Sequence, residues 1–211
     1  MIGHDEIARA AAALGVDLPA GGVERLAAFG RLLLKWNRTY NLTAIRDPQQ
    51  VLSHHLLDSL AVLPQLGAVG RIADIGSGAG LPGIVLAIAR PDLQVVSIEA
   101  AGKKASFQRQ ARIELALENF RPEHCRVEQC RGAAGFDAVI SRAFSDLAGF
   151  ARLALPLLAP GGRMLAMKGR RPQQELDALP PGVSVAGVVE LRVPGVDAER
   201  HLIVMTSDGA A

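Results

Sequence analysis

Residues 71–83 read RIADIGSGAGLPG, and the organisation of the whole chain can be inferred outward from them. A short apolar run with one acid, Asp74, leads into three glycines at alternate positions, Gly76, Gly78 and Gly80. This order predicts a buried parallel strand, a glycine turn and a helix. Glycine has no Cβ, so a ligand can lie against the backbone of such a turn, where a helix N-terminus also presents unpaired N–H groups. The stretch therefore indicates a nucleotide-type binding turn, with a glycine-rich turn that binds nothing as the alternative.

The spacing of the glycines narrows the class of nucleotide. A dinucleotide fingerprint requires a third small residue where this chain has Leu81, which disfavours NAD. A phosphate-binding P-loop requires a lysine that does not follow Gly83. An acid two residues before a G-x-G-x-G pattern resembles the first motif of class I S-adenosylmethionine-dependent methyltransferases. That resemblance implies that Asp74 helps to hold the methionine amino end of the cofactor.

Composition sets broad limits on the protein. The 211 residues, 49% of them hydrophobic, suit one domain or one domain with an extension. No run of 18 apolar residues and no secretory h-region is present, so we expect a cytoplasmic protein without a membrane span. Cys125 and Cys130 lack partners at zinc spacing, so we expect reduced cysteines and no metal site. The net charge of +2 neither requires nor excludes nucleic acid.

The chain divides into a helical part and an alternating part. Residues 1–68 are predicted to form an N-terminal helical extension, whose second helix carries an apolar stripe and whose third follows Asp47-Pro48. Residues 69–211 alternate strands and helices and are predicted to form a Rossmann-like α/β domain with a seven-stranded sheet and an antiparallel last strand. The predicted strands are Arg71–Gly76, Gln94–Glu99, Arg126–Gln129, Phe136–Ser141, Arg163–Lys168, Val183–Val193 and His201–Thr206. The predicted helices between them are Gly80–Ala89, Gly102–Glu118, Ser145–Leu158 and Pro172–Ala178.

Ligands of such sheets bind beyond the carboxyl ends of the strands. Glu99 stands where a carboxylate can accept both ribose hydroxyls, although it could be an ordinary exposed acid. Arg142 and Lys168 end two further predicted strands, where a cation usually meets an anion of the ligand, of RNA or of the protein itself. His55 and Asp58 are three residues apart and so share one helix face, an arrangement that is often only structural.

Eight segments together resemble one family along nearly the whole chain, from Phe29 to Met205. They read KWNRTYNLTAIRDP, HHLLDSL, DIGSGAGLPGI, EAAGKKASF, RVEQC, FDAVISRAF, MLAMKG and ERHLIVM. The chain is thereby identified as similar to the glucose-inhibited division protein B family, the bacterial small-subunit ribosomal RNA guanine-N7 methyltransferases. One departure is Glu99, where relatives often have Asp.

The resemblance implies transfer of a methyl group from S-adenosylmethionine to N7 of a specific guanine in 16S ribosomal RNA, free or in the 30S particle, with S-adenosylhomocysteine as product. Guanine N7 carries a lone pair and no proton, so no general base is needed, and we expect catalysis by positioning and electrostatics in a monomer. The expected cofactor-binding residues are Asp74, Gly76, Gly78, Leu81, Glu99, Val127, Glu128 and Arg142. The expected catalytic residues are Arg142, Lys168, His55 and Asn41, and the expected RNA-binding residues are Lys35, Arg38, Arg46, Lys168, Arg200 and His201.

Three other functions stay open at this point. The protein could bind the nucleoside cofactor as a sensor, could methylate a small molecule, or could be an NAD-type oxidoreductase, which Leu81 disfavours. Dependence of turnover on RNA separates the first two from the family interpretation, and the identity of the cofactor separates the third.

Overall fold

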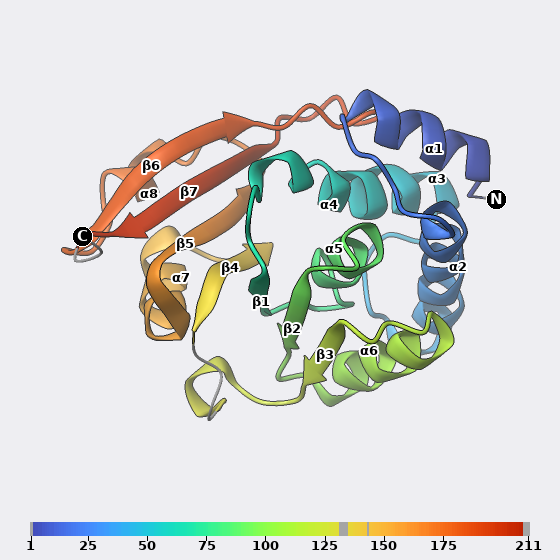
Figure 1. Cartoon of the computed structure of the whole chain (residues 1–211), viewed down its shortest axis with the longest axis horizontal. Helices are drawn as coiled ribbons and strands as arrows, with labels where there is room; N and C mark the ends of the chain where they lie inside the picture. The colour runs from blue at the N-terminus through green and yellow to red at the C-terminus, as the bar shows by residue number, and fades with distance from the viewer. Residues whose placement is uncertain (1, 131–134, 143, 209–211) are drawn as a thin grey trace.

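The structure is a computed structural model that describes residues 2–130, 135–142 and 144–208. It contains a seven-stranded sheet of order β3-β2-β1-β4-β5-β7-β6, in which β7 runs antiparallel to β5 and β6 (Figure 1). The predicted α/β class, the number of seven strands and the antiparallel last strand are confirmed. The strands are β1 Arg71–Ile75, β2 Gln94–Ile98, β3 Phe120–Glu123, β4 Phe136–Arg142, β5 Leu158–Lys168, β6 Val183–Glu190 and β7 His201–Ser207.

Helices cover both faces of the sheet because successive strand residues point to opposite sides. Ile72 of β1 belongs to a core shared with the N-terminal helices, α5 and α6, whereas Ala73 packs in a second core with α7. Figure 1 places α7 away from α4, α5 and α6 across the sheet. The helices are α1 His4–Ala13, α2 Gly22–Tyr40, α3 Pro48–Val51, α4 Asp58–Leu60, α5 Gly83–Ala89, α6 Gly102–Glu114, α7 Leu147–Ala154 and α8 Gln173–Leu176. Shorter segments are the π-helical η1 Leu52–Leu57 and the 3-10 helices η2 Leu63–Gln65, η3 Val127–Gln129 and η4 Leu155–Leu157.

The N-terminal helices share a hydrophobic core with the sheet. Buried side chains such as Leu26, Phe29 and Leu56 belong to the same cluster as Ile84 of α5 and Leu165 of β5. Residues 1–68 and 69–211 differ in sequence pattern but pack on one shared core. The division of the chain into two domains at this point stays a prediction. In the part of the chain that the structure describes, every helix is too short or too polar to cross a membrane.

The prediction for the third strand is wrong. The structure forms β3 at Phe120–Glu123, and Val127–Gln129 is a 3-10 helix instead of part of a strand. β3 is the edge of the sheet and pairs only with β2, so Pro122 can lie in it and exposed Arg121 is tolerated. The preceding helix α6 accordingly ends at Glu114 and not at Glu118.

The remaining element predictions are right in kind, and only their ends differ. The helix after the glycine turn begins at Gly83 instead of Gly80, since residues 80–82 belong to the turn. The helix α7 begins at Leu147 because Asp146 caps it and accepts a hydrogen bond from the Gly149 N–H at 2.6 Å, and it ends at Ala154, where the 3-10 helix η4 begins. The strand β6 ends at Glu190 and not at Val193.

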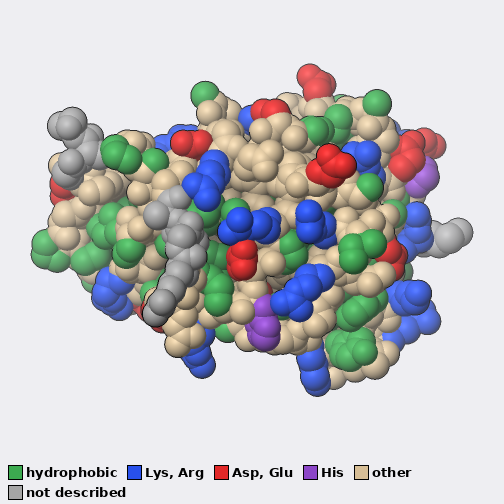
Figure 2. All heavy atoms as spheres, turned by 60° about the horizontal axis from the view of Figure 1, so that its bottom comes forward, with side chains coloured by type: hydrophobic (Ala, Val, Ile, Leu, Met, Phe, Trp, Pro, Cys, Tyr) green, Lys and Arg blue, Asp and Glu red, His purple; other side chains and the backbone are tan. Residues whose placement is uncertain are grey.

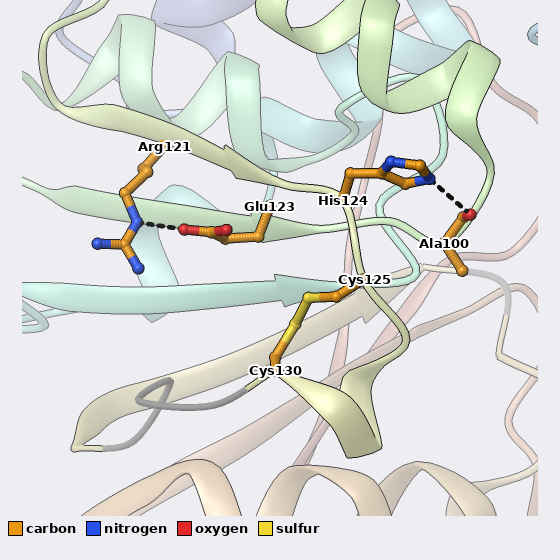
Figure 3. Close-up of a disulfide and its surroundings, with 6 residues drawn as sticks. All are labelled: Ala100, Arg121, Glu123, His124, Cys125 and Cys130. Carbon is orange, nitrogen blue, oxygen red and sulfur yellow. Dashed lines mark hydrogen bonds and ion pairs between the residues drawn. A yellow bond between two sulfur atoms is a disulfide. The ribbon is translucent and has the colours of Figure 1, made fainter.

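The expectation of reduced cysteines is also wrong for this structure. Cys125 and Cys130 form a disulfide that encloses the 3-10 helix beyond the end of β3 (Figure 3). Figure 3 also shows the neighbouring His124 turned towards Ala100, whose carbonyl lies 3.2 Å from Nε2. The bridge therefore ties both ends of the segment that carries Val127 and Glu128. The loop 131–135 that follows lies mostly outside the described residues.

Candidate active site

The glycine turn follows β1 at the point where the order of the strands reverses. β1 pairs with β2 on one side and β4 on the other, and this switch point is where ligands of open α/β sheets bind. Gly76, Gly78 and Gly80 all have positive φ angles, of 64°, 59° and 79°, which favour glycine. A Cβ on Gly80 would lie 2.4 Å from Ile84 Cδ1, whereas a Cβ on Gly78 would meet nothing within 4 Å. The open space of the turn is therefore beside Gly78.

Glu99 holds the glycine turn from the end of β2. Its Oε2 accepts a hydrogen bond from the Gly78 N–H at 2.7 Å, and its Oε1 accepts one from the Ala101 N–H at 2.7 Å. Each carboxylate oxygen can accept a second bond, so the expected role towards ribose hydroxyls is compatible with these contacts. Glu99 is buried, which rules out an ordinary exposed acid.

Sequence reasoning missed a polar network under the turn. The buried Gln108 of α6 donates from Nε2 to the Gly78 carbonyl at 2.8 Å and lies 2.8 Å from the Ser77 hydroxyl. The Ser97 hydroxyl of β2 lies 2.6 Å from the Ser77 hydroxyl and 2.8 Å from Oε1 of Gln108. A signal was available, because Gln108 occupies the same buried helix face as Ala105 and Ala111. A buried amide on an apolar face needs a polar partner.

Asp74 is fully buried beside the same turn. Its Oδ2 accepts a hydrogen bond from the Gly83 N–H, the start of α5, at 2.8 Å. Its Oδ1 is the buried side-chain acceptor that has no partner among the described residues. Burial raises the pKa of Asp74 to about 7, partly opposed by the Gly83 hydrogen bond and the Arg142 charge. Such an atom fits a ligand that brings a hydrogen-bond donor or a positive charge.

A cavity of about 350 Å³ opens beyond the carboxyl ends of β4 and β5. It brings together Arg142, Lys168, Arg200 and His201, which were all predicted for the site, from three separate segments of the chain. Its lining is Ile45, His54, Asp58, Arg142, Met167, Lys168, Gly169, Leu191, Arg200 and His201.

Asp58 joins two of these cations across the cavity. Its Oδ1 accepts a hydrogen bond from Arg200 Nε at 3.1 Å, and its Oδ2 lies 3.5 Å from an Arg142 guanidinium nitrogen. The same nitrogen of Arg142 donates to the His54 carbonyl at 3.1 Å. Asp58 begins α4 directly after the π-helical segment η1, a rare conformation that is frequent at functional sites. The sequence places Asp58 on one helix face with His55, but it does not predict the contacts of Asp58 with Arg142 and Arg200.

His55 lies behind Arg142. Its Nδ1 is 3.3 Å from the Arg142 guanidinium and its Nε2 is 2.9 Å from the Thr43 hydroxyl. Burial and the Arg142 charge lower the pKa of His55 to about 4, so the ring is neutral at pH 7. Thr43 is itself fixed by Asn37, whose Oδ1 accepts from the Thr43 N–H at 2.9 Å and whose Nδ2 donates to the Ile45 carbonyl. The N-terminal helices thus position the arginine at the end of β4.

Lys168 has a partner that the sequence did not suggest. Its Nζ lies 2.8 Å from Oε2 of Glu175 and 3.2 Å from the Phe144 carbonyl. The anion that Lys168 meets in this structure is therefore one of the protein itself, Glu175. His201 contacts the Gly169 carbonyl through Nδ1 at 2.9 Å.

The other predicted residues lie away from this cavity. Asn41 is exposed, ends α2 with a φ of 49° and accepts a hydrogen bond from Arg46 at 2.8 Å. Lys35 and Arg38 are exposed on α2. Val127 packs partly against the core near the disulfide, while Glu128 is exposed.

Exposed charges of both signs lie on one face of the molecule. On the face drawn in Figure 2, Lys and Arg side chains are interspersed with Asp and Glu side chains. Within the described residues, no group of three His, Cys, Asp or Glu side chains could hold a metal ion.

Comparison with known proteins gives consistent matches. The family model described as rRNA small subunit methyltransferase G matches residues 23–203. The ribosomal RNA small subunit methyltransferase G of Azoarcus sp. (strain BH72) is 60% identical and that of Aromatoleum aromaticum is 59% identical. The first alignment covers 92% of both chains, and the second covers 92% of this chain and 94% of the relative.

Solved structures share the fold at low sequence identity. TrmN from Thermus thermophilus has a TM-score of 0.61 and 23% identity, and the match covers 81% of this chain and 53% of that chain. A SAM-dependent methyltransferase from Aquifex aeolicus has a TM-score of 0.57 and 17% identity, over 75% of this chain and 93% of that chain.

Proposed function

Because the chain belongs to the rRNA small subunit methyltransferase G family, we propose that it transfers a methyl group from S-adenosylmethionine to N7 of a specific guanine in 16S ribosomal RNA. The observation that carries this proposal is the adjacency of two features at one edge of the sheet. The glycine turn with the unpartnered Asp74 oxygen follows β1, and the cation-lined cavity lies at the ends of the neighbouring β4 and β5. Arg142 lies between them, close enough for its charge to act on Asp74 and to line the cavity.

The turn suits the cofactor. Oδ1 of Asp74 is a buried acceptor that the ammonium of the methionine part would satisfy, and the space beside Gly78 admits a ligand against the backbone. Glu99 offers one free acceptor position on each oxygen to the ribose hydroxyls. When bound, the cofactor supplies a methyl group on a positively charged sulfur. Further proposed contacts are Gly76 and Leu81 at the turn and Val127 and Glu128 near the adenine.

The cavity suits a base and its phosphates. Guanine N7 attacks with its own lone pair, so the neutral His55 need not act as a base, and we assign it a role in positioning Arg142. Arg142, Lys168 and Arg200 line the cavity as hydrogen-bond donors and can hold the base or balance phosphate charge. The rate enhancement then comes from alignment of N7 with the methyl group and from electrostatics. Asn41 is a proposed site residue only by resemblance.

The RNA substrate determines which further residues are proposed to take part and where the protein is proposed to act. A base inside folded RNA must be splayed out before it can enter a cavity of this size. The basic side chains Lys35, Arg38, Arg46, Arg200 and His201 are proposed to contact RNA around that base. We infer that the protein works in the cytoplasm, as a monomer, on 16S rRNA or on the 30S particle.

The test uses labelled S-adenosylmethionine with 30S particles and with naked 16S rRNA from cells that lack the gene. The product is mapped by chemical strand scission at N7-methylguanine. A single scission in 16S rRNA is the expected result, and the better substrate identifies the stage of assembly. Tight cofactor binding without transfer to either RNA would overturn the RNA function and leave the fold unaffected.

A further inference from the structure

The cavity contains one carboxylate among its cations. Of the described residues that line it, only Asp58 is acidic, and its side chain is 6% exposed. Arg142 and Arg200 hold this carboxylate by one oxygen each, at 3.5 Å and 3.1 Å. Two arginines from distant segments therefore fix the orientation of one buried acid at the wall of a cavity proposed to receive a base.

The chemistry of the reaction restricts how guanine can be recognised there. N7 is the nucleophile, so it must face the methyl group and cannot be held by a donor. The opposite edge of guanine carries the N1–H and N2–H donors, which adenine does not present in this pattern. A carboxylate accepts with both oxygens and donates with neither, so it complements that edge.

Asp58 has the capacity for this contact. A carboxylate has about four acceptor positions, and the arginine on each oxygen uses one of them. One position on each oxygen stays available, which matches the number of donors that the N1–H and N2–H groups present. The cations that line the cavity can donate to O6, which needs donors.

We propose that Asp58 recognises the target guanine by accepting hydrogen bonds from N1–H and N2–H, and thereby determines the base specificity of the methyl transfer. This proposal rests on the proposed function of the site. Adenine in the same position would place its N1 acceptor against a carboxylate oxygen, and a site built to accept from a donor discriminates strongly against such a base.

The experiment compares guanine with inosine, which lacks only the N2 amino group. Semi-synthetic 16S rRNA carries either base at the target position, and transfer of labelled methyl is measured with the wild type and with Asp58→Asn. For the wild type, kcat/KM should fall about 10- to 100-fold on inosine, the range for loss of a hydrogen bond to a charged group. For Asp58→Asn, activity on guanine should fall and the inosine penalty should shrink below about threefold, since its amide cannot accept both protons. Equal inosine penalties in the two proteins would overturn the proposal.

Two controls separate the possible failures. Asp197→Asn removes an exposed acid outside the cavity and should keep the wild-type inosine penalty. Thermal unfolding and S-adenosylhomocysteine binding report whether Asp58→Asn is folded. If it is not, the wild-type comparison decides, because equal rates on inosine and guanine would overturn the proposal. Absence of transfer to guanine by the wild type would instead overturn the proposed function, and the assignment of Asp58 with it.

Discussion

Asp74 is the residue whose burial has the clearest consequence for ligand binding. Its pKa is raised to about 7 by burial, so the free protein carries a mixture of neutral and charged Asp74 near neutral pH. An ammonium group at the unpartnered Oδ1 would favour the charged form. We therefore expect the Kd of S-adenosylhomocysteine to rise as the pH falls below 7, by up to about tenfold per pH unit. Calorimetric titration between pH 5.5 and 8 measures this. A Kd that is independent of pH, or equally dependent on pH in Asp74→Asn, would contradict the assignment.

The same residue should weaken the folded state at high pH. Between pH 3.8 and 7 the folded protein keeps the Asp74 proton and the unfolded chain does not, so this group lowers the free energy of unfolding as pH rises through that window. Asp74→Asn removes the charge, so its free energy of unfolding at pH 8 should exceed that of the wild type by roughly 1–3 kcal/mol, with a smaller difference at pH 5.5. Thermal unfolding without cofactor at both pH values tests this. A variant less stable than the wild type at pH 8 would show that the acid is better accommodated than its burial suggests.

At the scale of elements, the glycine turn combines two different demands. Both Gly78 and Gly80 have a left-handed φ, which strains any other residue. A Cβ on Gly80 would also collide with Ile84, whereas a Cβ on Gly78 would enter open space. Gly80→Ala should therefore cost about 2–4 kcal/mol of unfolding free energy, from strain and overpacking together. Gly78→Ala should cost only about 1–2 kcal/mol, from backbone strain, but should weaken cofactor binding. Denaturant unfolding and cofactor titration of both variants measure the contrast, and equal losses of stability would refute it.

The disulfide is the second element with a measurable effect. It closes the short loop around Val127–Gln129, and a cross-link over about six residues stabilises by about 2 kcal/mol in the chain-entropy model. Reduction by a dithiol should lower the free energy of unfolding by up to that amount. Cys125→Ser should show the same loss and no response to the reductant. If the reductant affects both proteins alike, or neither, the bridge does not stabilise the fold.

These elements also show what local sequence can and cannot predict. The strand, turn and helix around residues 71–89 are predictable because their apolar pattern and glycines are contiguous in the chain. The third strand is misplaced by the sequence pattern because Phe120–Glu123 is an edge strand, in which a proline and charged residues replace the apolar alternation. The contact of Asp58 with Arg200 joins residues 142 positions apart, and no local pattern contains such a pair. Strand ends identify the arginines, but only the fold identifies their partner.

At the scale of the molecule, a net charge of only +2 gives little general attraction to RNA. The affinity for RNA therefore depends on where the cationic side chains lie on the surface. Lys35, Arg38 and Arg46 are exposed in the N-terminal part, which also supplies Asp58 and His54 to the cavity wall, and we propose that they contact RNA around the cavity. Their joint replacement by glutamine should weaken RNA binding at low salt. It should also make the negative slope of the logarithm of the binding constant against the logarithm of the salt concentration shallower, by about 0.7–0.9 for each phosphate that the variant no longer neutralises. Filter binding of 16S rRNA at several salt concentrations measures this.

The matched control replaces the exposed Arg9, Lys103 and Arg109, which removes the same charge. An equal change in slope for both triple variants would mean that overall charge, and not the position of Lys35, Arg38 and Arg46, attracts the RNA.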